Sequence, residues 1–286
     1  MGTKAVPVKC SADTCSFDGV IFPELGAAVA DGTAPHVLEA SMPLVKDKII
    51  DISPGYENDF AEKYGSIIET TDRKKKELYS KAYLSLGAAG KADLIMKKVL
   101  KDLMITDKAE RFTDHILKGG LRGKANVKPC ACFNCEGFSI SLPENISSIT
   151  VIGDYFGSSE LLLATAAEKC KIKGIECIVI PSPVNAESVS ALCLGENAYV
   201  GGRYFELENV KKVNKKRFIK TDEYKVRKQE LMRINKIYQD GINAAVDYMG
   251  QARNLHMKIE SIYSLRADYS AADRAFVELA QIIFGA

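Results

Sequence analysis

The chain has 286 residues, of which 47% are hydrophobic and 27% are charged. This composition is typical of a folded globular protein and excludes a disordered or fibrous chain, and the length leaves room for two domains. Lys and Arg number 39 against 37 Asp and Glu, so the net charge of +2 gives no electrostatic reason to expect binding to DNA, RNA or a membrane.

The first residues, Met1 to Val8, lack the apolar stretch of a secretory signal. Apolar runs elsewhere, such as Leu161 to Ala164, are far too short to cross a bilayer. Eight cysteines in a chain of this length are too few for a disulfide scaffold. We therefore expect a cytoplasmic protein with reduced thiols.

The first α/β segment begins with a short strand, Val6 to Cys10, and continues to an apolar run that ends at Asp31. P-loop nucleotide hydrolases use a carboxylate in this position to hold Mg²⁺. Glu24, which precedes the same run, is a second candidate carboxylate. Asp31 and Glu24 are therefore the candidate catalytic residues of this segment.

The second α/β segment has clearer boundaries. Ile149 to Ile152 is a β-branched run typical of a buried strand, and Ser158 begins a helix that is expected to end at Gly174. Residues 175–180 form the next expected strand, and the helical crossover between the two strands predicts that they are parallel. A further strand is expected over residues 197–200.

Helices account for most of the remaining sequence. The first of them is expected to break or kink near Gly87 and Gly90, because glycine weakens a helix interior. The expected helical ranges are 72–103, 108–117, 223–256 and 261–284. These ranges predict one long helical hairpin after each α/β segment.

The loop between the expected strand and helix of the second segment contains Gly153 and Gly157, followed by Ser158 and Ser159. A glycine-rich loop in this place is the usual cradle for phosphate, because backbone N–H groups and the helix dipole converge there. These four residues are therefore the candidate nucleotide-binding set.

Several residues of this loop differ from an intact P-loop. Ser158 stands where the lysine for the β- and γ-phosphates belongs, and Ile152 replaces the first glycine. Asp154 and Glu160 add negative charge that repels phosphate. Two interpretations remain open: a degenerate nucleotide site, or a turn that only connects a strand to a helix.

The two α/β segments have weak similarities in the same order, including a serine and a glutamate at nearly the same spacing, which indicates a duplication. The expected units are residues 1–108 and 109–286. The first begins at the equivalent of the second strand of the other, so the duplication predicts a further strand, loop and helix before it. An uncovered sheet edge there favours a homodimer.

Three stretches, Cys10 to Asp13, Asp18 to Leu25 and Val29 to Val37, resemble the segment that follows the first P-loop in the bacterial two-copy P-loop ATPase family. Members of this family are often described as ATPases or nucleotide kinases without an established substrate. Ile149 to Leu162 resembles the second P-loop strand, loop and helix of that family. The resemblance covers most of the chain and is sharpest over residues 8–37.

This resemblance implies an α/β fold of duplicated P-loop units with parallel sheets and helical hairpins, the first unit truncated. It also implies ATP and Mg²⁺ as ligands. Gly153, Gly157, Ser158 and Ser159 correspond to the remnant of the phosphate cradle, and Asp31 to the magnesium-side acid of the first site.

The densest cysteine cluster is Cys130, Cys132 and Cys135. Three thiolates at this spacing could serve Zn²⁺ or an iron–sulfur cluster, but no fourth ligand is adjacent, so incidental thiols are the preferred interpretation. Three functions therefore remain as alternatives: an ATP-binding protein of weak or lost activity, a non-catalytic pseudo-ATPase that acts as a scaffold for an unknown protein partner, and a cysteine-based metal or redox protein.

Overall fold

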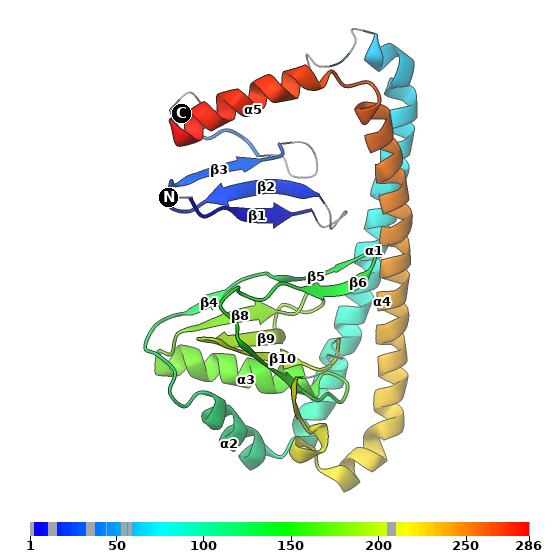
Figure 1. Cartoon of the computed structure of the whole chain (residues 1–286). Coiled ribbons are helices and arrows are strands. Elements are labelled where there is room, and N and C mark those ends of the chain that lie inside the picture. The colour runs from blue at the N-terminus through cyan, green and yellow to red at the C-terminus, as the bar shows by residue number, and fades with distance from the viewer. Residues whose placement is uncertain are drawn as a thin grey trace. The chain divides into compact units, whose positions relative to one another are not determined.

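A computed structural model describes residues 3–10, 16–32, 38–43, 45–52, 56, 59–204 and 210–285. Residues 11–15 and 33–37, part of the stretch that carries the sharpest family resemblance, lie outside this description. The chain forms two compact units: unit 1 comprises residues 1–78 and 251–286, and unit 2 comprises residues 79–250 (Figure 1). The division expected at residue 108 falls inside unit 2.

Unit 2 is built on a six-stranded mixed sheet in the order β11-β7-β10-β9-β8-β4. β9 is antiparallel to both of its neighbours, and the other neighbouring pairs of this sheet are parallel. The strands are β4 (Ala125–Val127), β7 (Ser148–Ile152), β8 (Cys177–Pro181), β9 (Val189–Leu194), β10 (Asn197–Gly201) and β11 (Lys211–Val213).

The sequence predicts the positions of β7, β8 and β10 correctly, but it does not predict that other strands lie between β7 and β8 in the sheet. These two strands run in the same direction, as the helical crossover predicts, yet β10 and β9 lie between them. The reason is β9, whose six residues are all buried and which takes a central place in the sheet. Its continuous apolar character gives no alternation by which a strand could be recognised.

Helix α3 (Ser158–Lys173) has the bounds that the sequence predicts, and Gly174 ends it in left-handed backbone with φ of 63°. α3 packs on β9 and β10 and against α2 (Thr106–Ile116). Leu162, Leu163 and Ala166 of α3 share one buried core with Phe112 of α2. A two-stranded hairpin of β5 (Ala131–Asn134) and β6 (Gly137–Ile140) completes the strands described in unit 2.

The two longest helices are α1 (Phe60–Leu103) and α4 (Thr221–Ser264). Of the break or kink expected in the first of these near Gly87 and Gly90, the break is wrong, because α1 is continuous. Gly90 instead permits a close approach: a Cβ at this position would lie 2.8 Å from the carbonyl oxygen of Val184. Within unit 2, α1 and α4 pack together through one buried apolar core.

Unit 1 holds the small sheet of β1 (Val6–Lys9), β2 (Phe17–Phe22) and β3 (Ala27–Ala30), together with α5 (Tyr269–Phe284) and the adjoining ends of α1 and α4. Both strand pairs described in it are antiparallel, so the expected parallel sheet is wrong for this unit. The reason is the tight turn between β2 and β3, which joins neighbouring strands directly and so forces them to run in opposite directions.

The fold class is therefore mixed α/β, with parallel strand pairs confined to unit 2 among the strands described. No helix within the described ranges has both the length and the apolar character needed to cross a membrane.

The contact between α1 and α4 can be tested at Gly241 of α4. A Cβ there would lie 2.8 Å from the carbonyl oxygen of Ser85 and 3.2 Å from the Cβ of Ala89. We expect Gly241→Ala to lower the free energy of unfolding by about 1–3 kcal/mol, because the two helix backbones must separate. Urea unfolding of the purified chain measures this change.

Gly250→Ala on the same helix is the matched control, since the nearest atom to its added Cβ is 3.9 Å away. The control is expected to be neutral or to stabilise by up to about 1 kcal/mol through helix propensity. Equal effects of the two substitutions would contradict the close packing of α1 against α4.

Candidate functional site

The loop between β7 and α3 joins a buried strand to a helix N-terminus, which is the setting that a phosphate cradle needs. Phe156 and Gly157 have left-handed backbone, with φ of 51° and 100°. Successive N–H groups in such a turn converge, and the dipole of α3 adds a partial positive charge. The backbone is therefore arranged to receive negative charge.

The carboxylate of Asp154 supplies that negative charge from within the loop. Its Oδ2 accepts a hydrogen bond of 2.8 Å from the N–H of Gly157, and its Oδ1 accepts one of 2.9 Å from the N–H of Ser159. The hydroxyl of Ser159 donates a third bond, of 2.6 Å, to Oδ1. The donors that would hold a phosphate thus hold a side chain of the same loop.

The remaining predicted cradle residues also have structural roles. The hydroxyl of Ser158 accepts a 2.8 Å hydrogen bond from the N–H of Tyr155, and Ser158 is only 3% exposed. Gly153 donates its N–H to the carbonyl oxygen of Val213 at 2.9 Å, and a Cβ at Gly153 would lie 2.8 Å from that oxygen. Both residues therefore make hydrogen bonds that hold the loop in place.

The predicted carboxylates Asp31 and Glu24 lie in unit 1, whereas the loop lies in unit 2. Asp31 directly follows β3, and Glu24 is in the turn that precedes it, so the two residues lie at opposite ends of this strand. Both are exposed. The structure therefore does not bring Asp31 and Glu24 together in one site.

A buried cluster of four charged side chains adjoins the loop. Lys97 of α1 donates hydrogen bonds of 2.7 Å to both Asp93 and Glu160. Arg203 pairs with the same two carboxylates, at 3.2 Å from Glu160. The four side chains are between 1% and 7% exposed, and their charges sum to zero.

This cluster lies against the last residue of the loop. A Cβ at Gly157 would lie 3.0 Å from Nη1 of Arg203 and 3.1 Å from Cε of Lys97. Both cations are paired with carboxylates, so neither replaces the missing P-loop lysine. Within the described ranges, Nε and Nη2 of Arg203 and Oε1 of Glu160 are buried without a hydrogen-bond partner.

Ion pairing controls the protonation of Asp93 in this cluster. Burial alone would raise the pKa of the Asp93 carboxyl, but the charges and hydrogen bonds of Lys97 and Arg203 outweigh burial and hold this pKa below its ordinary value. Burial raises the pKa of the hydroxyl of Tyr204, and also that of Tyr238, whose ring lies 3.7 Å from the Arg203 guanidinium. The two phenols are therefore neutral at pH 7, and their hydroxyls are hydrogen-bonded to each other.

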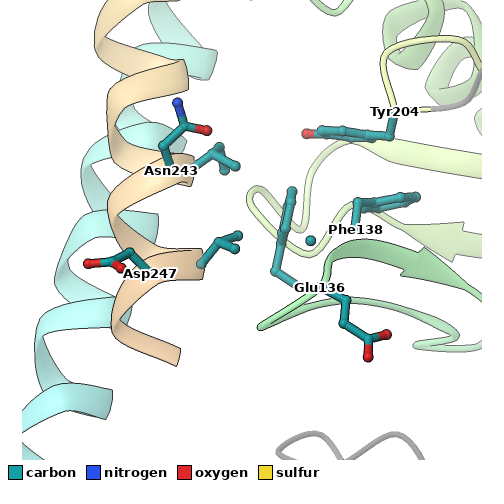
Figure 2. A pocket seen from close by; sticks show the side chains of 9 residues that line it. Glu136, Phe138, Tyr204, Asn243 and Asp247 are labelled. Carbon is teal, nitrogen blue, oxygen red and sulfur yellow. The ribbon is translucent and has the colours of Figure 1, made fainter. Parts of the chain in front are cut away.

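A groove of about 650 Å³ lies in unit 2 between the β5–β6 hairpin and α4 (Figure 2). Its aromatic wall consists of Phe133, Phe138 and Tyr204, of which the last two stack with ring centroids 4.3 Å apart. Ile242 and Val246 of α4 form the opposite wall.

Polar residues occupy the rim of this groove. Figure 2 shows Asp247 on α4 and Glu136 on the hairpin with their carboxylates turned away from the aromatic wall, and Asn243 one turn along α4 from Asp247. The two carboxylates give the rim negative charge. The groove therefore combines an apolar interior with an acidic rim.

The cysteine cluster does not gather into one site. Cys130 packs beside one apolar core and Cys135 beside another, and the Sγ of Cys132 is 3.0 Å from the hydroxyl of Ser139. In the described part of the chain, no three or more His, Cys, Asp or Glu side chains are grouped so that they could hold a metal ion.

Sequence reasoning missed the charged cluster, although a signal for it exists. Asp93 and Lys97 lie four residues apart on the face of α1 that also carries Met96 and Leu100, all four of which are buried. A charged pair on an otherwise apolar helix face indicates a buried ion pair. Arg203 has no such signal, because it follows β10 in an irregular segment.

Comparison of the chain with protein-family models, with curated proteins and with solved structures finds no match. The resemblance to the two-copy P-loop ATPase family therefore stays a prediction.

The charged cluster can be tested by removing one cation. Lys97→Met leaves Asp93 and Glu160 buried with one cation fewer, and we expect it to lower the free energy of unfolding by about 3–5 kcal/mol. Lys98→Met on the exposed face of α1 is the control, with an expected effect within about 0.5 kcal/mol. A mild effect of Lys97→Met in urea unfolding would show that the cluster does not stabilise unit 2.

The depressed pKa of Asp93 predicts a pH dependence. Its ionised form stabilises the folded state above the unfolded-state pKa of about 4, and this contribution is lost as pH falls through the lower folded-state pKa. The difference in unfolding free energy between wild type and Asp93→Asn should be largest near neutral pH and shrink below about pH 4. A difference that grows on acidification would contradict the assigned direction.

Proposed function

We propose that the chain is a non-catalytic scaffold protein of the P-loop ATPase type, in which the loop of unit 2 holds a carboxylate in place of a nucleotide phosphate. The observation that carries this proposal is the Asp154 carboxylate, which accepts hydrogen bonds from Gly157 and Ser159. The ligands expected for this loop, ATP and Mg²⁺, do not fit the residues that are present.

ATP could displace this carboxylate only at a cost. Charge-assisted hydrogen bonds contribute about 1.5–3 kcal/mol each, and Asp154 would have to give up three of them. Glu160 adds a second negative charge beside the loop, and the nearby cations Lys97 and Arg203 are already paired. Ser158 offers no positive charge where a P-loop has its lysine.

The order of elements supports the duplicated architecture that belongs to this proposal. The antiparallel run β1-β2-β3 of unit 1 has a counterpart in β8-β9-β10 of unit 2. A helix of 44 residues follows each run, α1 in one case and α4 in the other, and a shorter helix follows each long one. In unit 2 alone, β7, the loop and α3 precede the run among the elements described.

Two further features favour a scaffold over an enzyme. The cluster of Asp93, Lys97, Glu160 and Arg203 links α1, α3 and the segment after β10 through its own ion pairs. The groove between the β5–β6 hairpin and α4 has the aromatic interior and polar rim that are common at protein interfaces. A core held by buried ion pairs, together with a groove that has an aromatic interior and a polar rim, suits a protein that binds partners.

Calorimetric titration tests the proposal, with Mg-ATP and with tripolyphosphate as ligands. Wild type is expected to bind neither of them measurably, because Asp154 already uses the donors of the loop. Asp154→Gly vacates the cradle and is expected to increase the affinity for tripolyphosphate about tenfold or more, which corresponds to about 1.4 kcal/mol.

Glu144→Gly is the matched control, since it removes one carboxylate from an exposed turn of the same unit. The control should bind tripolyphosphate no better than wild type does. Micromolar binding of Mg-ATP by wild type would contradict the proposal, as would an equal gain in the two variants, which would assign the effect to net charge.

A further inference from the structure

The described residues of unit 1 bury very little apolar surface. Among its described residues, the buried apolar side chains are those of Ala252 and Ile259, both on α4. The four buried apolar cores described for the chain all lie in unit 2. A folded domain needs a core, so unit 1 presents apolar surface that is suited to contact with another polypeptide.

The two edges of the small sheet differ in character. β1 carries Pro7 and Lys9, and both residue types discourage further strand pairing. β3 consists of Ala27 to Ala30 and has no proline and no charge. No strand pairs with its outer edge in the described part of unit 1. The outer edge of β3 is therefore suited to pairing with an uncharged strand, whereas the edge at β1 is protected against such pairing.

Helix α5 presents a second uncovered surface. None of its residues is buried, although most of them are apolar. Phe276 is 72% exposed, and Val277 and Phe284 are both more than half exposed. A helix with such a wide apolar face is normally covered on more than one side.

Unit 2 shows how one segment covers three such surfaces at once. β7 pairs in parallel with β10, the counterpart of β3. α3, which follows β7, packs on the sheet and also against α2, the counterpart of α5. A single strand, loop and helix thus cover the strand edge, the sheet face and the short helix.

We infer that unit 1 binds a strand–loop–helix segment of a partner polypeptide, with its strand parallel to the outer edge of β3 and its helix against the sheet and α5. The matching chemistry is that of β7 and α3: an uncharged, β-branched strand followed by a helix with an apolar face. Antiparallel pairing of β3 with β3 of a second copy would cover only the edge and would leave α5 exposed. A strand–loop–helix segment therefore fits better than a second copy does.

A synthetic peptide of residues 146–174 of this chain serves as the probe, because it has the chemistry inferred for the partner. Hydrogen exchange of the full-length chain is measured by mass spectrometry with and without the peptide. We expect saturable slowing of exchange in β3 and α5, and no slowing in β1. A scrambled peptide of the same composition is expected to have no effect.

Two variants locate the contact. Val29→Lys places a charge on β3 and should weaken peptide binding about tenfold or more, whereas Val8→Lys on β1 should not change it. Circular dichroism checks that both variants are folded, and the protection pattern of wild type stands independently of either variant.

Three outcomes would overturn the inference. One is the absence of protection in unit 1 at every peptide concentration, and another is protection of β1 instead of β3. The third is a dimer in light scattering that Val29→Lys dissociates, since this result would assign the β3 edge to a second copy.

Discussion

The hydrogen bonds that the Asp154 carboxylate accepts determine what the loop of unit 2 can do. The left-handed turn at Phe156 and Gly157 directs backbone N–H groups inward, and such a group of donors requires an acceptor. In a nucleotide-binding protein a phosphate provides it. Here the acceptor is a side chain of the same loop, so the turn is complete without a ligand.

The charged cluster beside the loop is also paired within the protein. A buried cation near Gly157 would attract phosphate if it were unpaired, but Lys97 and Arg203 are each bound to Asp93 and Glu160. Because buried charges are stable only when they are paired, the four side chains depend on one another. The loop is closed by its own carboxylate, and the cluster is held by pairing among its own side chains. Unit 1, in contrast, has apolar surfaces that its described residues leave uncovered.

Local sequence signals were sufficient for several elements. Ser158 and Gly174 mark the two ends of α3, and the β-branched residues before Gly153 mark β7. The order of the sheet could not be predicted, since β9 is buried throughout and has no alternating pattern. The continuity of α1 was missed because the reason for Gly90 is a contact with Val184, which is distant in sequence.

The candidate site was predictable only in part. The sequence indicates the loop and the negative charge of Asp154 and Glu160, and both are present next to the N-terminus of α3. It does not reveal that Asp154 folds back onto its own loop, because that depends on the left-handed turn. Arg203 was also missed, since its partners come from other elements.

Backbone amide resonances of the loop provide the most direct test that the cradle is already filled. The amide signals of Gly157 and Ser159 can be followed by NMR while Mg-ATP is added to the wild-type chain. If Asp154 holds these donors, their chemical shifts remain unchanged at every nucleotide concentration of the titration. A saturable shift of both signals would show that a phosphate replaces the carboxylate and would contradict the account.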